Sequence, residues 1–150
     1  MKNSHSFDLR ADAHWRIAIV HSSFYPHEMR ALVDSAQKAL VAAGVPKENI
    51  ADYPVFGSFE IPLLGAAIAR AKKADAIIGL GIIVEGETAH AQLIADAAAH
   101  GMMDVQTRTQ IPFAFEILLV KSVKEAQERL SKGAEAVHAV LTALVALSSL

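Results

Sequence analysis

The sequence AIIGLGIIVEGETAH, residues 76–90, joins an uninterrupted apolar run to a polar turn and the start of a helical pattern. The run Ala76–Val84 is apolar throughout, which is typical of a parallel strand covered on both faces. Gly86–His90 then places a glycine, a hydroxyl and an imidazole where a strand passes into a helix. Open α/β sheets bind their ligands at such turns. We therefore expect a parallel α/β fold with its ligand site near Gly86–His90.

Strand and helix patterns alternate on both sides of this stretch. Short β-branched or apolar runs predict strands, and apolar residues at helical spacing predict helices. The expected strands are 16–21, 50–55, 76–84 and 111–120, and the expected helices are 26–43, 59–72, 88–107, 123–130 and 134–147. Thr88 is the expected N-cap of the helix over 88–107.

This order predicts a single-domain, doubly wound parallel four-stranded sheet flanked by helices, a flavodoxin-like three-layer sandwich. We expect an N-terminal arm over residues 1–15 and an α/β domain over residues 16–150. Phe7 or Trp15 is a candidate for docking the arm on a neighbouring subunit.

Composition narrows the classes of function. The 150 residues are 53% hydrophobic, carry a net charge of −2 and include no cysteine. The charge gives no sign of a nucleic-acid surface, and the lack of cysteine excludes disulfides, thiolate nucleophiles and cysteine-ligated metals. No run is both long and apolar enough to span a bilayer, and the polar N-terminus lacks a signal-peptide core, so the cytoplasm is expected. The excess of apolar residues indicates surfaces buried between subunits.

Several loops with unusual residues meet at one edge, because the carboxyl ends of parallel strands share that edge. Phe24 and Tyr25 are adjacent aromatics that can stack on a flat ligand ring or pack in the core. Gly57 permits a close approach of the backbone. Glu60 near a helix start can accept hydrogen bonds from ligand hydroxyls or can cap the helix.

The segment Gly86–His90 combines an anion site with a proton carrier. Backbone N–H groups at a helix N-terminus can hold a phosphate, and an imidazole exchanges protons near neutral pH. The alternatives are that Thr88 only caps the helix and that His90 is a solvated residue. Arg129 can bind a phosphate or form a surface pair with Glu125. No paired histidines at metal-ligand spacing accompany these residues.

Taken in order, these motifs resemble the lumazine synthase family of riboflavin biosynthesis. One matching segment alone would be a weak signal, but GSFEIP and GETAH at this spacing within alternating strands and helices are specific. The matching segments are 16–20 with 23–24, 57–62, 86–90, 111–112 with 115, 128–129, and 132–136.

The resemblance implies a transferase that condenses 5-amino-6-(ribitylamino)uracil with 3,4-dihydroxy-2-butanone 4-phosphate to give 6,7-dimethyl-8-ribityllumazine. It implies no metal or redox cofactor, and His90 as the catalytic proton carrier. The implied substrate-binding residues are Phe24, Gly57, Ser58, Phe59, Glu60, Ile83, Val84, Glu87, Thr88, Phe115 and Arg129. Phe115 and Arg129 would come from the adjacent subunit of a homo-oligomer built from pentamers, some of which form decamers or icosahedral shells.

The chain departs from the family pattern at four places. Gln92 stands where an acid is frequent, Tyr25 replaces a frequent asparagine, Glu116 replaces a frequent glycine, and the linker Leu130–Ser131 is short. Two alternatives to an active enzyme are therefore a catalytically weak homologue that binds flavin or lumazine, and a shell-forming homologue.

Overall fold

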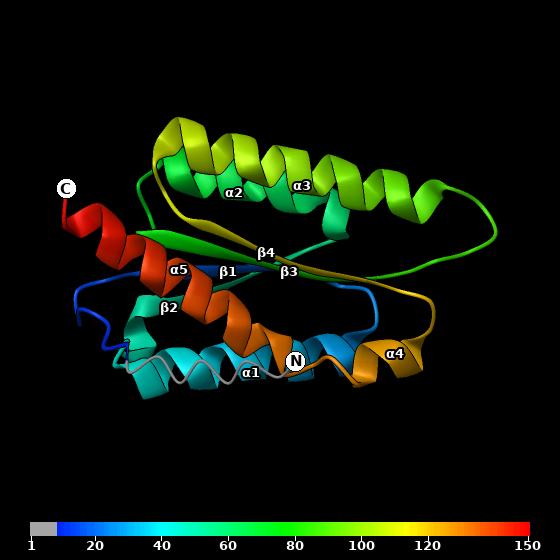
Figure 1. Cartoon of the computed structure of the whole chain (residues 1–150), viewed down its shortest axis with the longest axis horizontal. Coiled ribbons are helices and arrows are strands. Elements are labelled where there is room, and N and C mark those ends of the chain that lie inside the picture. Colours follow the sequence, from blue (N-terminus) through cyan, green and yellow to red (C-terminus); the bar gives the residue numbers. More distant parts are fainter. Residues whose placement is uncertain (1–8) are drawn as a thin grey trace.

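The architecture is an open parallel sheet between two layers of helices, seen in a computed structural model that describes residues 9–150 (Figure 1). The four strands lie in the order β2-β1-β3-β4, and every neighbouring pair is parallel. Along the chain the elements are β1 (Ile17–Ser22), α1 (Pro26–Ala43), η1 (Lys47–Asn49), β2 (Ile50–Val55), η2 (Ser58–Glu60), α2 (Ile61–Arg70), β3 (Ala76–Val84), α3 (His90–Thr109), β4 (Phe113–Val120), α4 (Val123–Gln127) and α5 (Lys132–Ser148).

Helices α1 and α5 pack on one face of the sheet, and α2 and α3 pack on the other. The β1 side chains show why both faces need cover. Ile17 and Ile19 enter the core beneath α1 and α5, while Ala18 and Val20 enter the core beneath α2 and α3. Successive strand residues point to opposite faces, so a strand apolar at every position requires two helical layers. The predicted doubly wound parallel fold is confirmed.

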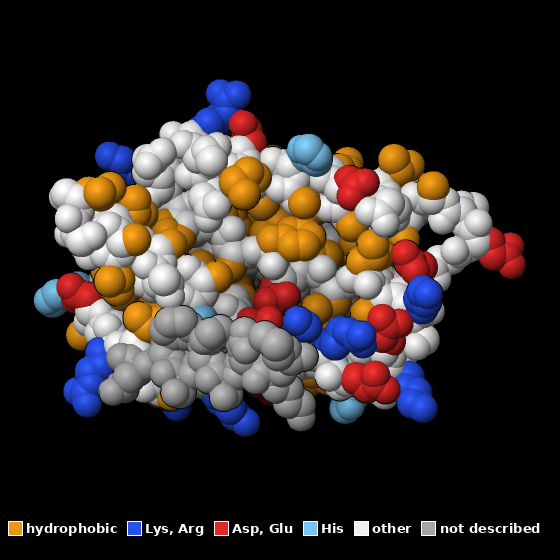
Figure 2. All heavy atoms as spheres, viewed as in Figure 1, with side chains coloured by type: hydrophobic (Ala, Val, Ile, Leu, Met, Phe, Trp, Pro, Cys, Tyr) orange, Lys and Arg blue, Asp and Glu red, His pale blue; other side chains and the backbone are white. Residues whose placement is uncertain are grey.

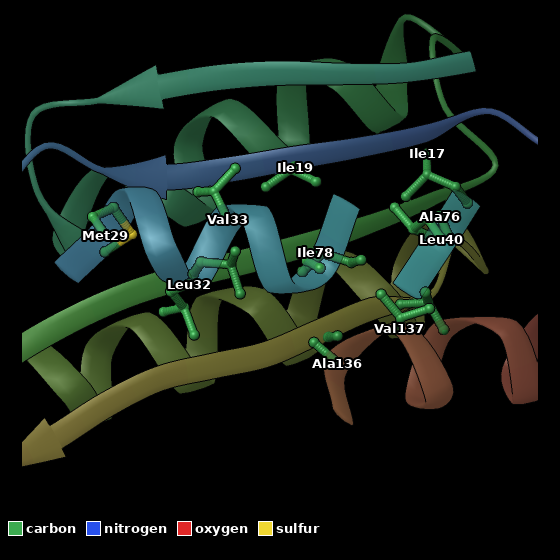
Figure 3. Packing of buried hydrophobic residues seen from close by; sticks show 14 of the residues in the cluster. Ile17, Ile19, Met29, Leu32, Val33, Leu40, Ala76, Ile78, Ala136 and Val137 are labelled. Carbon is green, nitrogen blue, oxygen red and sulfur yellow. The ribbon is translucent and has the colours of Figure 1, made fainter. Parts of the chain in front are cut away.

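The core beneath α1 and α5 is the larger of the two. In Figure 3, Leu32 and Val33 of α1 reach toward Ile19 and Ile78 of the sheet. Gly133 lets α5 lie directly against α1, because a Cβ there would overlap the carbonyl oxygen of Leu32 and approach the amide nitrogen of Ala36 to 2.9 Å. The first turn of α5 therefore depends on a residue without a side chain.

Several predicted boundaries are wrong by a few residues. Helix α3 begins at His90 with Ala89 as its N-cap, so Thr88 is not the cap. The Thr88 hydroxyl still accepts a hydrogen bond from the amide of His90, at 3.4 Å. Helix α5 begins at Lys132 rather than at residue 134, and the segment predicted as one helix from residue 59 is a 3₁₀ turn followed by α2.

The arm before β1 packs partly on this chain. Leu9, Ala11 and Trp15 contact the core beneath α1 and α5, and the amide of Ala11 donates to the carbonyl of Ala43 at 2.8 Å. Trp15 thus packs partly against its own subunit, and Phe7 lies outside the described residues. Within residues 9–150, no helix is long and apolar enough to cross a membrane.

Candidate functional site at the carboxyl edge of the sheet

The loops that follow the strands meet at the carboxyl edge of the sheet, on the right in Figure 1. The loop after β1 carries Phe24 and the loop after β2 carries Phe56. The segment after β3 is Glu85–Ala89, and it leads into His90. The sheet therefore assembles residues from separate parts of the sequence along one edge.

Two aromatic rings form the first part of the site. Phe24 and Phe56 contact each other edge to face, with ring centroids 5.3 Å apart and an interplanar angle of 77°. Both remain accessible, with 47% of Phe24 and 75% of Phe56 exposed. Tyr25 has a φ of 54° and caps α1, which turns the chain sharply after Phe24. Sequence analysis missed Phe56, although an aromatic residue directly after a strand at this edge was a usable signal.

The segment Gly57–Glu60 is held by its own side chains. Glu60 Oε1 accepts a hydrogen bond from the amide of Gly57 at 3.0 Å, so the capping interpretation is correct for this oxygen. A carboxylate has two oxygens and further lone pairs, so capping leaves acceptor capacity for a ligand. A Cβ on Gly57 would lie 3.3 Å from the Phe24 ring, which shows how closely the two loops approach.

The Ser58 side chain is buried at the centre of this segment. Only 5% of Ser58 is exposed, and within the described residues its hydroxyl has no hydrogen-bond partner. It lies over Gly81 of β3, where a Cβ would overlap the hydroxyl oxygen. The glycine in the strand therefore makes room for a hydroxyl that retains its full hydrogen-bonding capacity.

The turn Gly86–His90 is open to solvent. Residues 85–90 are all exposed, while Ile83 and Val84 at the end of β3 are half-buried. The first four amides of a helix lack partners within the helix, and they carry the positive end of its dipole. The start of α3 thus offers donors to an anion beside the imidazole of His90.

Gln92 does not orient His90. Its side-chain amide donates to Asp96 Oδ1 at 2.8 Å, one turn further along α3. Residues two apart on a helix do not face each other, so this pair lies on another side of α3. His90 is therefore positioned by the start of the helix and by the contact of its amide with Thr88.

Arg129 follows α4 and is tied to Glu125. Its Nη1 donates to the backbone carbonyl of Glu125 at 2.9 Å, and its Nη2 lies 3.5 Å from Glu125 Oε1. Glu125 is itself held, since its Oε2 accepts from the amide of Lys121 at 3.0 Å. The guanidinium is about two-fifths exposed, so the ion pair leaves part of it open to an anion.

Phe115 does not join the aromatic pair within one chain. It is 44% exposed and lies opposite Gly79 in the middle of the sheet, five positions before the paired residues Val84 and Val120. At a rise of about 3.3 Å per residue, this is roughly 16 Å from the carboxyl edge. A single subunit therefore leaves Phe115 outside the cluster around Phe24 and His90.

Glu116, the residue after Phe115, is half-buried on the face that α5 covers. Burial raises the pKa of its carboxyl from 4.5 to about 7; Lys132 opposes the rise and Glu135 adds to it. A carboxyl with this pKa changes charge near neutral pH. Glu116 is therefore a titrating group beneath α5, on the face of β4 opposite to that of Phe115.

The comparisons with known proteins agree with this geometry. The family "6,7-dimethyl-8-ribityllumazine synthase" matches residues 14–148. The chain belongs to this family. A protein of that name from Kineococcus radiotolerans is 36% identical over 139 residues, covering 88% of this chain and 84% of that protein. One from Xylella fastidiosa is 38% identical over 140 residues, covering 90% of this chain and 91% of that protein. One from Leuconostoc mesenteroides is 33% identical over 131 residues, covering 84% of each chain.

Membership confirms the expected family and its class of enzyme, a transferase of riboflavin biosynthesis. Among solved structures, a de novo designed Rossmann fold protein superposes with a TM-score of 0.42 at 18% identity, covering 80% of this chain and 98% of that one. That likeness carries no argument, and the fold assignment rests on the strand order and the two helical layers.

Proposed function

We propose that this chain condenses 5-amino-6-(ribitylamino)uracil with 3,4-dihydroxy-2-butanone 4-phosphate at the carboxyl edge of its sheet, forming 6,7-dimethyl-8-ribityllumazine. The observation that carries the proposal is the convergence of an exposed aromatic pair, a carboxylate-capped glycine segment and a helix N-terminus with a histidine. These three parts match a flat ring, a polyol chain and a phosphate.

The pyrimidine and its ribityl chain occupy the side of the site nearest β1 and β2. Phe24 stacks on the ring, since an accessible aromatic face favours offset stacking. Ser58 and Glu60 bind the ribityl hydroxyls, with Gly57 and Phe59 beside them. The buried hydroxyl of Ser58 and the second oxygen of Glu60 supply the hydrogen-bonding capacity. The backbone of Ile83 and Val84 contacts the ring.

The butanone phosphate lies at the start of α3. Backbone groups of Glu87 and Thr88 hold its phosphate, as expected for an anion at a helix N-terminus. The amine of the pyrimidine attacks the ketone and water leaves to give an imine; phosphate is then eliminated, and ring closure releases water. His90 moves the protons of these steps, because an imidazole can accept and donate near neutral pH. Holding two substrates together supplies a further part of the rate.

The site is completed by a second copy of the chain. Phe115 and Arg129 of a neighbouring subunit close over the ring and bind the phosphate in a pentamer-based homo-oligomer located in the cytoplasm. The mid-strand position of Phe115, far from its own carboxyl edge, supports this arrangement. Figure 2 supports it as well, since hydrophobic side chains gather on the surface over α3 and β4. Leu93 and Met103 of α3 are 66% and 56% exposed.

Turnover of the two purified substrates tests the proposal, because the lumazine product is fluorescent. We expect product formation well above the uncatalysed background, and a strong loss in His90→Ala with unchanged oligomer mass. No product above background would reject the activity. Riboflavin binding without turnover would identify a binding homologue, and large particles with an inert pocket would identify a shell protein.

Mixing two impaired variants, assayed at a butanone phosphate concentration well below KM, tests the shared site. His90→Ala and Arg129→Ala subunits are refolded together in equal amounts. If each site takes His90 from one copy and Arg129 from the next, about a quarter of the sites contain both intact residues, and activity rises above the mean of the two components. If both residues act within one subunit, the activity of the mixture equals that mean.

A further inference from the structure

His21 of β1 has both ring nitrogens against acceptors. Its Nε2 lies 2.7 Å from Asp52 Oδ1 on the neighbouring strand β2, and its Nδ1 lies 3.0 Å from the backbone carbonyl oxygen of Ser22. The imidazole is only 15% exposed. This pair lies outside the site described above.

These two contacts join β2 and the end of β1 through one side chain. A carbonyl oxygen and a carboxylate only accept, so the ring nitrogen that faces each of them can serve only as a donor. The ring therefore bridges Asp52 of β2 and the backbone of Ser22.

The groups around the ring are few. Asp52 faces it from β2, and Arg30 of α1 lines the same cavity of about 180 Å³ beneath the ring. Arg30 is exposed, so water screens its charge. Asp52 is therefore the main charged partner of His21.

The pair lies on the β1–β2 seam, by which we mean the line of contacts between these two strands. Among the described strands, β2 pairs only with β1, and Pro54, which lies opposite His21 in the register, has no N–H to donate. Beyond Pro54, Ser23 continues the seam: its hydroxyl donates to the carbonyl of Val55 at 2.5 Å and its amide to that of Phe56 at 3.3 Å. The contacts run from Asp52 to Phe56, whose ring touches Phe24.

We propose that His21 is a positioning residue, whose ring holds β2 against β1 and thereby positions Phe56 and the Gly57–Glu60 segment for the pyrimidine substrate. This inference rests on the proposed function only for the identity of the substrate. Removal of the His21 ring or of the Asp52 carboxylate breaks the contact between the two strands. The seam then loosens beside the site, and the affinity for the pyrimidine falls while the chemistry at His90 continues.

The Michaelis constant for the pyrimidine, measured in wild type and variants at one pH, is the first test. In His21→Ala and Asp52→Ala, we expect KM to rise about two- to tenfold, which is the equilibrium equivalent of one net hydrogen bond. We expect kcat to stay within about twofold of wild type. His14→Ala is the matched control, because His14 is exposed before β1 at the opposite edge of the sheet.

Hydrogen exchange of the peptide that spans residues 50–60 is the second test and needs no turnover. After correction for intrinsic rates, exchange is expected to be faster in both variants than in wild type, and unchanged in His14→Ala.

Each result has a defined meaning. A KM that remains as in wild type in both variants overturns the positioning role, whether or not the exchange rate changes. A kcat that falls while KM is unchanged also overturns it, because the substitution then acts on the chemistry. If wild type makes no lumazine, the proposed function fails, while the exchange measurement still decides whether His21 holds the seam.

Discussion

Glu116→Gln is expected to stabilise the folded protein at alkaline pH. Glu116 lies in β4 and is half-buried, and burial raises the pKa of its carboxyl from 4.5 to about 7. The folded chain therefore binds more protons than the unfolded chain between these two values. Stability falls as the pH rises through that window, and the full destabilisation is present above about pH 7. Glutamine cannot ionise, so the variant lacks this loss.

The size of the effect follows from the shift. A rise of this extent corresponds to about 3 kcal/mol if the carboxyl were shielded completely from water. Because Glu116 is partly exposed, solvent screening reduces the expected difference to about 1–2 kcal/mol. The difference shrinks toward zero near pH 4, where both states carry a neutral carboxyl.

Urea denaturation at fixed protein concentration, repeated from about pH 4 to about pH 8.5, measures the difference in the free energy of unfolding. Glu48→Gln in η1 is the matched control, since Glu48 is exposed and its replacement is expected to leave the pH profile unchanged. A constant offset between Glu116→Gln and wild type across all pH values would refute the reasoning, because a loss of contacts would then explain the effect rather than ionisation. A variant less stable than wild type at alkaline pH would refute it too.

Three further perturbations test other parts of the molecule. His90→Ala is expected to lower kcat for lumazine formation about 10²- to 10⁴-fold, the usual contribution of a positioned proton carrier; an unchanged kcat would remove His90 from the chemistry. Arg129→Ala is expected to raise KM for the butanone phosphate about tenfold or more while leaving KM for the pyrimidine unchanged. Arg108→Ala, which replaces an exposed arginine, is the control. Equal effects on the two Michaelis constants would contradict a phosphate contact. Gly133→Ala is expected to lower the free energy of unfolding by about 1–3 kcal/mol, measured by denaturation, because its Cβ would overlap the backbone of α1; wild-type stability would show that α5 shifts freely.

Most of the fold was predictable because its sequence signals are local. Strands β2 and β3 and helix α1 have the predicted bounds. For β3 the signal was an unbroken run of apolar residues, which is needed because helices cover both faces of the sheet. For α1 it was Pro26 at the start and Gly44 at the end, which adopts the expected left-handed conformation with a φ of 106°. These signals depend on neighbours in the sequence and not on tertiary contacts.

The details of the site depend on contacts that sequence patterns do not encode. Thr88 has the properties of an N-cap, yet α3 begins after Ala89. Glu60 was open to two interpretations, and the distance to the amide of Gly57 decided that it caps its segment. The His21–Asp52 pair could not be predicted for a different reason. It depends on the register of two parallel strands, and the types of the side chains alone do not set that register.

The register of β4 also bears on how many subunits an active site needs. In the sequence, Phe24, His90 and Phe115 belong to one set of motifs. In the structure, Phe115 pairs with Gly79 and therefore lies away from the carboxyl edge of its own sheet. A neighbouring copy can bring an exposed mid-strand residue to that edge, since an oligomer repeats the same surface around a symmetry axis. Glu116 follows Phe115 directly but points to the other face of β4, the face that α5 covers. Its ionisation near neutral pH therefore acts on the packing of α5 within one chain, and not on the surface that Phe115 presents to a neighbour.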